Sequence, residues 1–238
     1  MNGYYKIAGL TVQMDTFGRT LAQAQPYAAA AVDPPDIRIH TPPERFLEKE
    51  AGVPDSDFEH MCSCYSFYRQ LMDHDGMLLH SSAVVMDGRA YLFSASSGTG
   101  KSTHTGLWQR VFGSDRARIL NDDKPALRLE DGVWYAYGTP WSGKTARNLN
   151  LKVPLAGIAF LERGEVNEIQ RISGMRVIQT LMTQTLRTED MAARVKQLDL
   201  LDKLITQIPV WKLKCNMEPE AAVVAYEAMS GEKWRNEI

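Results

Sequence analysis

Apolar residues gather in short runs along the middle of the chain, and tight-turn sequences separate these runs. Residues 82–86 and 89–93 flank Asp87-Gly88, and residues 125–130 and 133–138 flank Asp131-Gly132. Apolar segments on both sides of an Asp-Gly pair are a strong short-range signal for a β-hairpin. The pattern therefore predicts two hairpins.

The residues between the two hairpins predict a helix and a further strand. THTGLWQRVF, residues 103–112, has a helical pattern that ends at Gly113, and ARILNDD, residues 117–123, reads as a buried strand that ends in two acids. The connection from the first hairpin through this helix is long enough for a parallel crossover.

The C-terminal third is predicted to be mostly helical. Ser173 is the expected cap of one helix, and VWKLKC, residues 210–215, is an expected strand before a last helix opened by Pro219. Two apolar stripes are expected to face the core: Met175, Ile178, Leu181, Met182 and Leu186, and then Met191, Val195, Leu198, Leu201, Ile205 and Ile208. These helices also leave a homo-oligomer possible.

Residues 1–79 have weaker periodicity than the rest of the chain. Residues 4–14 read as one opening strand, and residues 58–72 fit either a strand or a short helix. We expect residues 1–79 to form a cap or small sheet region beside a catalytic domain of residues 80–238.

Composition and charge exclude several classes of function. The 238 residues carry a net charge of -2, which argues against nucleic acid as a partner. The sequence shows no basic and then apolar N-terminal segment and no run of about 18 apolar residues, which argues against a membrane partner. Cys62, Cys64 and Cys215 are expected to be free thiols, because their odd number does not suit a disulfide framework. These features predict a cytoplasmic protein.

FSASSGTGKST, residues 93–103, directly follows the second strand of the first hairpin. A phosphate loop aims backbone N–H groups and a helix N-terminus at an anion, and glycines supply the backbone freedom it needs. Ala95 stands where the usual pattern begins with glycine, which would be costly if that position required a positive φ. The predicted nucleotide contacts are Ser96, Ser97, Gly98, Thr99, Gly100, Lys101, Ser102 and Thr103.

Two adjacent acids form the second candidate group. Asp122 and Asp123 end a predicted strand beside the loop, where one can bind Mg²⁺ with Ser102 while the other accepts a proton from an attacking hydroxyl. Neighbouring residues of an extended chain point to opposite sides, so the sequence leaves open which acid faces the metal. His80 fits either an active-site role or a packing role. The remaining histidines read as structural or exposed: His40, His60, His74 and His104.

GTPWSGKTARN, residues 138–148, is the third candidate group. It carries Trp141, Lys144 and Arg147 in a turn-rich stretch after a predicted strand. Arg147 is a candidate for stabilising the charge on a transferring phosphoryl group. An ordinary surface loop explains this stretch equally well.

HSSAVVMDGRAYLFSASSGTGKST, residues 80–103, followed by ILNDD, residues 119–123, resembles the catalytic core of HPr kinase/phosphorylase, which shares its core with the phosphoenolpyruvate carboxykinases. The resemblance implies an α/β fold: a mixed sheet with β-hairpins around a phosphate loop, a small N-terminal α+β region and C-terminal helices. It also implies ATP and Mg²⁺ as cofactors and active-site roles for His80, Lys101 and the two aspartates. GTPWSGK stands where HPr kinases carry a glycine-flanked acidic signature. The likeness is therefore to compact HPr-kinase-like proteins found beside peptide-modification genes, some of which phosphorylate a precursor peptide on serine.

These observations predict an ATP- and Mg²⁺-dependent kinase. It would transfer the γ-phosphoryl group to a hydroxyl acceptor, most directly a serine of a peptide or protein. A small-molecule alcohol is the alternative acceptor, and a carboxykinase-like phosphotransferase is an alternative enzyme. Ala95 favours a third reading, a nucleotide-binding sensor or scaffold without catalysis.

Overall fold

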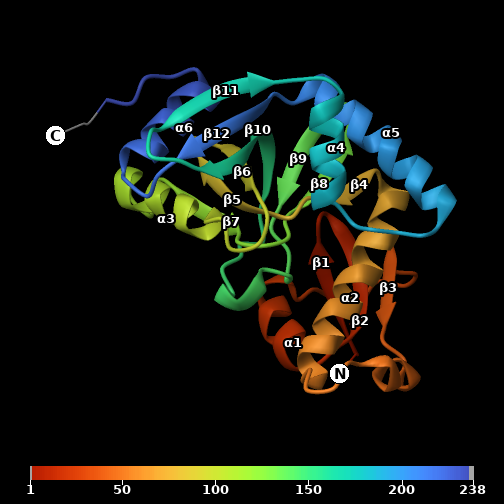
Figure 1. Cartoon of the computed structure of the whole chain (residues 1–238). Coiled ribbons are helices and arrows are strands. Elements are labelled where there is room, and N and C mark those ends of the chain that lie inside the picture. Colours follow the sequence, from red (N-terminus) through yellow and green to blue (C-terminus); the bar gives the residue numbers. More distant parts are fainter. Residues whose placement is uncertain (1, 236–238) are drawn as a thin grey trace.

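A computed structural model of the chain describes residues 2–235 and shows a small three-stranded sheet beside a larger mixed sheet flanked by helices (Figure 1). The N-terminal unit holds the small sheet, in the order β1-β2-β3, together with two helices. Its elements are β1 (Asn2–Ile7), β2 (Leu10–Asp15), α1 (Gly18–Ala24), η1 (Gln25–Tyr27), β3 (Ile37–His40), η2 (Pro43–Glu48), α2 (Asp55–Leu71) and η3 (Met72–His74).

The single opening strand predicted for residues 4–14 is wrong, because the chain reverses at Ala8 and Gly9. Both residues have positive φ, 50° and 77°, and β1 and β2 pair antiparallel with Ile7 opposite Leu10. Positive φ at both central residues is the geometry of a two-residue hairpin turn. Ala-Gly is a weaker turn signal than Asp-Gly, which explains the error.

The helical alternative for residues 58–72 is confirmed, since most of this stretch lies in α2. Buried side chains recur on α2 at steps of three and four residues: Glu59, His60, Ser63, Cys64, Phe67, Tyr68 and Leu71. This spacing places them on one face of a helix. That face packs on the small sheet and forms the core of the N-terminal unit with residues such as Val12 and Ile37.

Within residues 2–235 the larger sheet has nine strands, with the path β4-β8-β9-β10-β6-β5-β7 and with β12 pairing β10 and β11. The strands are β4 (Gly76–Leu78), β5 (Ser81–Met86), β6 (Arg89–Ser94), β7 (Arg118–Asn121), β8 (Ala126–Glu130), β9 (Val133–Tyr137), β10 (Lys152–Arg163), β11 (Glu168–Ile172) and β12 (Val210–Cys215). The two predicted hairpins are confirmed as β5-β6 and β8-β9.

The predicted parallel crossover is also confirmed. Both β6 and β7 pair antiparallel with β5, so β6 and β7 run parallel to each other with β5 between them. The connecting helix is α3 (Lys101–Phe112). This topology brings the C-terminal ends of β6 and β7 to the same edge of the sheet.

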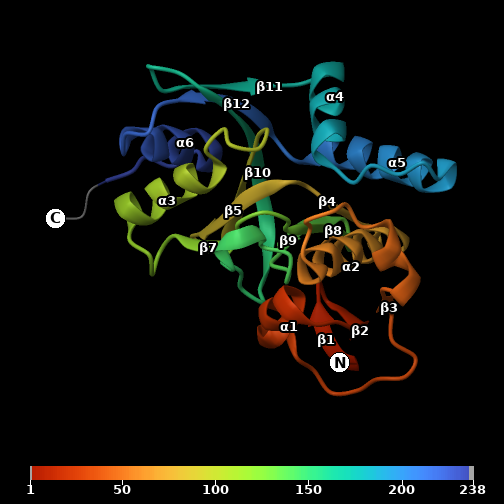
Figure 2. The same cartoon turned by 60° about the horizontal axis from the view of Figure 1, so that its bottom comes forward.

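Strand β10 occupies the centre of the sheet, and the sequence analysis did not predict it. Its first residues pair antiparallel with β9, and its later residues pair parallel with β6 on one side and with β12 on the other. Pro154 and Gly157 interrupt its apolar pattern, which hid the strand. The change of partners along β10 curls the sheet (Figure 2).

Helices cover both faces of the larger sheet, as both views show (Figures 1 and 2). They are α3 on one face with α6 (Glu220–Ser230), and α4 (Met175–Gln184) with α5 (Met191–Gln207) on the other. Successive residues of β6 point to opposite faces of the sheet. Leu92 lies in the core under α4 and α5, and Phe93 lies in the core under α3 and α6. The predicted α/β class with a mixed sheet and hairpins is confirmed.

The expected apolar faces of α4 and α5 are only partly correct. Gly174, not Ser173, is the N-cap of α4, and the cap has no side-chain hydrogen bond. Helix α4 buries Val177 and Leu181, and α5 buries Ala193, Gln197, Leu200, Leu201 and Leu204. Several predicted core residues are exposed instead: Met175, Met182, Met191, Val195 and Leu198. Helix α5 contains two apolar rows at helical spacing, and the row that packs on the sheet includes Leu200, Leu201 and Leu204.

The N-terminal unit and the larger sheet share one hydrophobic core. Ala126, Tyr137 and Trp141 come from the larger sheet and its loops, yet they pack with the residues of α2 and the small sheet. The ring of Trp141 stacks on Phe67 of α2 with 4.7 Å between centroids. Among residues 2–235, no helix combines the length and the apolar character needed to cross a membrane.

Candidate active site

The predicted phosphate loop connects the end of β6 at Ser94 to the start of α3 at Lys101. Gly98 and Gly100 have φ values of 77° and 123°, which L side chains rarely adopt. Ala95 does not have a positive φ. Alanine in place of the usual first glycine therefore causes no backbone strain in this loop.

Lys101 is buried beneath the loop and has no ion-pair partner among residues 2–235. Its Nζ donates a hydrogen bond to the Ala95 carbonyl at 3.0 Å. Burial lowers the pKa of the ammonium group, and the negative charges of Asp123 and Asp122 partly oppose that effect. A cation in this position is suited to an anion bound over the loop.

Arg163 holds the opposite side of the loop from the end of β10. Its guanidinium donates to the carbonyls of Gly98 at 2.5 Å and Thr99 at 3.3 Å. These bonds turn the two carbonyls toward Arg163. Two of the loop's backbone acceptors are thus directed at a cation.

Asp122 follows β7 and is almost fully buried. Its Oδ1 accepts from the Ser82 hydroxyl at 2.7 Å, and its Oδ2 accepts from the Thr145 hydroxyl at 2.9 Å. The Arg147 guanidinium lies 3.5 Å from the same Oδ2. Asp122 thereby connects β5, the end of β7 and residues 138–148.

Asp123 lies beside Asp122 and is more accessible, with 23% of its side chain exposed against 1% for Asp122. Its Oδ1 lies 3.1 Å from Nε2 of His80, and its Oδ2 lies 2.5 Å from Nζ of Lys124. Burial alone would raise the pKa of Asp123, but the His80 hydrogen bond and the Lys124 charge lower it to about 2. Asp123 is therefore held as a carboxylate.

Residues 138–148 are held in place by the N-terminal unit. Gln23 of α1 accepts from the Ser142 backbone N–H and hydroxyl and donates to the Gly143 carbonyl. The indole of Trp141 donates to the Ser63 hydroxyl of α2 at 3.1 Å. These contacts fix η4 (Gly143–Thr145) next to the two aspartates.

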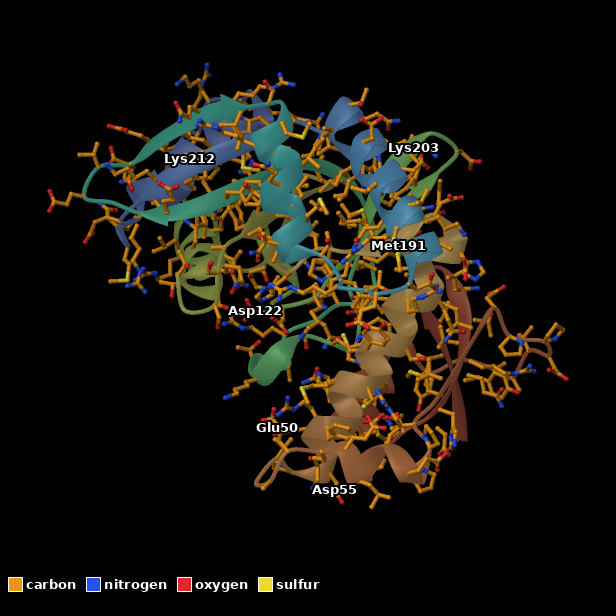
Figure 3. All side chains as sticks on the ribbon, turned by 45° about the vertical axis from the view of Figure 1, so that its right-hand side comes forward. Glu50, Asp55, Asp122, Met191, Lys203 and Lys212 are labelled. Carbon is orange, nitrogen blue, oxygen red and sulfur yellow. The ribbon has the colours of Figure 1, made fainter. Side chains whose placement is uncertain are left out.

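The loop, the aspartates and residues 142–145 line one charged cleft of about 560 Å³. Figure 3 places Asp122 between α3 and η4. The N-terminal unit completes the wall of the cleft. The lining residues are Arg19, His60, Met61, His80, Ser97, Gly98, Gly100, Lys101, Ser102, Thr103, Asp122, Asp123, Lys124, Ser142, Gly143, Lys144 and Thr145.

A second, more apolar cavity of about 460 Å³ adjoins the same loop. It shares Gly98, Gly100 and Thr103 with the charged cleft. Leu107 of α3, Leu161 of β10 and Met217 contribute its apolar lining. The loop therefore separates an apolar cavity from a charged one.

The donors for a divalent cation are oxygen atoms only. Ser102, Asp122 and Asp123 line the same cleft. Within residues 2–235 no group of three or more His, Cys, Asp or Glu side chains could hold a metal ion. Mg²⁺ commonly binds through one or two carboxylates plus substrate phosphates, so this donor set fits Mg²⁺ bound together with a nucleotide.

The family model described as "SynChlorMet cassette protein ScmC" matches residues 55–220, which is more than half of the chain. The chain belongs to the ScmC family. The matched range contains the whole predicted phosphate loop, both aspartates, η4 and all nine described strands of the larger sheet. It begins at the first residue of α2, so β1, β2, α1 and β3 lie outside it.

No curated protein matches the chain. Among solved structures, the HPr(Ser) kinase/phosphatase from Coxiella burnetii is similar at 11% identity and a TM-score of 0.38, over 65% of this chain and 95% of that chain. A TM-score this low shows only a distant structural similarity. The chemistry of this ScmC-family chain is therefore argued from its own side chains.

The structure gathers most of the predicted residues around the cleft. Ser97, Gly98, Gly100, Lys101, Ser102, Thr103, His80, Asp122 and Asp123 line it. Thr99 lines the apolar cavity, Ser96 is exposed on the loop, and Arg147 reaches the site through Asp122. The roles predicted for these residues remain predictions.

Sequence reasoning missed four residues that line the cleft. Arg19 and His60 come from the N-terminal unit, and Lys124 and Thr145 contact the aspartates. Lys124 directly follows Asp123, and Thr145 lies in the basic stretch already singled out, so both had a local signal. Arg19 and His60 had none, because only the tertiary fold brings α1 and α2 to the loop.

His104 agrees with the structural role expected for it. It is buried in the core under α3 and α6, where its Nε2 accepts from the Trp108 indole at 3.2 Å. Burial lowers its pKa to about 3. His104 is therefore a neutral packing residue at ordinary pH.

Proposed function

We propose that this protein is an ATP- and Mg²⁺-dependent kinase that transfers the γ-phosphoryl group to a hydroxyl acceptor. One observation carries the proposal. A glycine loop at a helix N-terminus opens into the same cleft as Asp122 and Asp123, and its buried Lys101 has no ion-pair partner among residues 2–235. Anion-binding groups and carboxylates thus meet at one place, as phosphoryl transfer requires.

The loop would hold the phosphates. The first N–H groups of α3 have no carbonyl partner within the helix, and the helix dipole adds positive potential there. Gly98 and Gly100 provide the backbone conformation, and Lys101 provides the charge. The apolar cavity beside Leu107 and Leu161 would take the nucleoside, since it adjoins the loop on the other side.

Ser102 and one or both aspartates would hold Mg²⁺ next to the phosphates. The bound ion would neutralise part of the phosphate charge. Asp122 is already fixed by Ser82 and Thr145, so its carboxylate has a defined orientation before any ligand arrives. This preorganisation lowers the cost of assembling the site.

Asp123 would orient the acceptor hydroxyl, because it is the more exposed acid and is held ionised by His80 and Lys124. The acceptor oxygen forms a bond to the γ-phosphorus while the bond from that phosphorus to the β,γ-bridging oxygen breaks. ADP leaves, and the hydroxyl proton passes to the Asp123 carboxylate. A weak base is sufficient when the transition state is loose and the proton moves late.

The acceptor class within this proposal is a serine of a peptide or protein, or a small-molecule alcohol. The ordinary φ of Ala95 removes the sequence feature that had favoured a non-catalytic sensor. The two carboxylates in the cleft favour a kinase over that alternative, because nucleotide binding alone does not need an accessible charged base.

Calorimetric titration of Mg·AMP-PNP tests the nucleotide half of the proposal. We expect wild type to bind, Lys101→Ala to lose binding, and the control Lys203→Gln to match wild type. Lys203 lies on α5, away from Asp122 (Figure 3). Wild-type protein that does not bind, or Lys101→Ala that binds as well as wild type, would sink the proposal.

A further inference from the structure

The charged cleft has a second half, formed by the N-terminal unit and η4. Arg19 on α1, His60 and Met61 on α2, and Lys144 on η4 line this half. Both cartoon views place η4 between α3 and α1 (Figures 1 and 2). This half therefore lies beyond the aspartates from the phosphate loop, where an acceptor would enter.

The cleft carries more positive than negative side chains. Arg19, Lys101, Lys124 and Lys144 line it, against Asp122 and Asp123. The phosphates would engage Lys101, and Asp123 neutralises Lys124 at 2.5 Å. Asp122 is paired with Arg147, which lies outside the lining, at 3.5 Å. The positive charge left over is that of Arg19 and Lys144, and both lie in the acceptor half.

These two cations differ in how far they are already paired. Arg19 contacts Asp57 through one terminal nitrogen at 2.5 Å, and its other N–H groups have no partner among residues 2–235. Lys144 is exposed and has no hydrogen-bond or ion-pair partner among residues 2–235. Together they supply roughly one uncompensated positive charge, which matches a carboxylate better than a doubly charged phosphate ester.

His60 also lines this half of the cleft and is 4% exposed. Its Nδ1 lies 3.0 Å from the Thr20 hydroxyl, which ties the ring to α1. Its Nε2 is buried and has no partner among the described residues.

Burial, together with the charges of Arg19 and Lys124, lowers the pKa of His60 to about 4. The ring is therefore neutral at ordinary pH and adds no charge to this half of the cleft.

We propose that Arg19 and Lys144 bind a carboxylate of the phosphoryl acceptor and so place its hydroxyl beside Asp123. This inference rests on the proposed kinase function and adds a substrate class to it. The acceptor would be a molecule in which a carboxylate lies close to a hydroxyl. Such a group can come from a free hydroxy acid, or from a serine or threonine next to an acidic residue in a peptide.

Binding of malonate, a probe with two carboxylates, tests the site without turnover. It would be titrated into the full chain with and without Mg·AMP-PNP, and neutral malonamide would serve as the matched ligand. We expect malonate but not malonamide to bind. Arg19→Gln and Lys144→Gln should bind malonate about threefold to tenfold more weakly, while Arg19→Lys and the control Lys203→Gln should stay near wild type.

The nucleotide-loaded titration excludes binding of malonate in the phosphate loop, and Lys101→Ala excludes it in the nucleotide-free protein. Thermal melts would establish that both glutamine variants are folded. Malonate that does not bind wild type, or that binds Arg19→Gln and Lys144→Gln as well as wild type, would overturn the inference.

Acceptor pairs then identify the source of the carboxylate. ADP formation would be compared for glycerate against glycerol, and for the peptide Gly-Ser-Glu against Gly-Ser-Gln. A preference for glycerate indicates a small hydroxy acid, a preference for the acidic peptide indicates a peptide, and equal rates within both pairs contradict the inference. If wild type bound malonate but did not bind Mg·AMP-PNP, the proposed kinase function would be overturned, and the carboxylate site would stand.

Discussion

Asp123 shows at the level of a single residue how the site sets its charges before any ligand binds. A carboxylate in a partly buried position would normally tend to take up a proton. The His80 hydrogen bond and the Lys124 ion pair reverse that tendency and lower the pKa of Asp123 to about 2. The acid proposed to orient the acceptor is therefore charged at every physiological pH.

This lowered pKa predicts a specific dependence of stability on pH. The folded-state pKa lies below the ordinary value of 3.8, so the charged form of Asp123 stabilises the fold above about pH 4. The contribution is about 2 kcal/mol and should disappear as the pH falls toward 2. In urea unfolding, the difference between wild type and Asp123→Asn should be large at pH 6 and should shrink at pH 3. A difference independent of pH would contradict this, and Asp202→Asn on α5 is the control.

Substitution of Lys101 should have opposite effects on the melting temperature and on nucleotide binding. Its ammonium is buried, with one carbonyl as its only hydrogen-bond acceptor among the described residues. Burial of a charge without an ionic partner costs free energy, so Lys101→Met should keep or raise the melting temperature while abolishing nucleotide binding. A large drop in melting temperature would show instead that Lys101 stabilises the fold.

At the level of elements, the site depends on contacts between α1 and residues 138–148. Gln23 bonds to both Ser142 and Gly143, and Thr145 in turn bonds to Asp122. Helix α1 therefore positions an aspartate that it does not touch. This connection explains how a turn-rich stretch whose helical element is the single turn η4 can hold a defined conformation.

Substitution of Gln23 tests this connection. Gln23→Ala removes the Gln23 acceptor of the Ser142 N–H and hydroxyl and the donor to the Gly143 carbonyl, and it leaves the Pro140 carbonyl as an acceptor of that N–H. Amide hydrogen exchange in residues 142–145 should therefore accelerate by about tenfold, as the loss of these side-chain bonds implies. Gln25→Ala is the matched control, because the Gln25 side chain is exposed and bonds only within its own segment. Equal exchange rates in the two variants would show that η4 is held by other contacts.

At the scale of the whole molecule, the N-terminal unit and the larger sheet share a core, and β4, which precedes the expected boundary between residues 79 and 80, pairs with β8 of the larger sheet. Trp141 belongs to the larger unit in sequence but packs against Phe67 and Tyr68 of the smaller one. Large fully buried aromatic side chains contribute several kcal/mol each to stability, and separation would expose them. The N-terminal unit is thus part of the fold as well as a wall of the cleft.

A fragment of residues 80–238 should therefore fail to fold independently. We expect it to lose the near-ultraviolet circular dichroism of its packed aromatic residues and to bind a hydrophobic dye, while the full chain unfolds in one cooperative transition. A fragment with native-like aromatic signals and sharp unfolding would show that the larger unit is an independent domain.

The sequence predicted what depends on short-range patterns and missed what depends on distant contacts. Both Asp-Gly hairpins, α3 and the crossover to β7 followed from local signals. The β1-β2 hairpin was missed because Ala8-Gly9 is a weak turn signal, and β10 was missed because Pro154 interrupts its apolar pattern. In the site, the loop and the acids could be predicted, whereas Arg19 and His60 reach the cleft only through packing of α1 and α2.

The most direct test of the proposed chemistry is ³¹P nuclear magnetic resonance of Mg·ATP with the full chain, glycerate and Gly-Ser-Glu. The proposed function predicts that wild type forms ADP together with a new phosphoester signal. Lys101→Ala and Asp123→Asn should form neither product, and Lys203→Gln should behave as wild type. Unchanged ATP with every acceptor in wild type, or the same products from Lys101→Ala, would contradict phosphoryl transfer at this site.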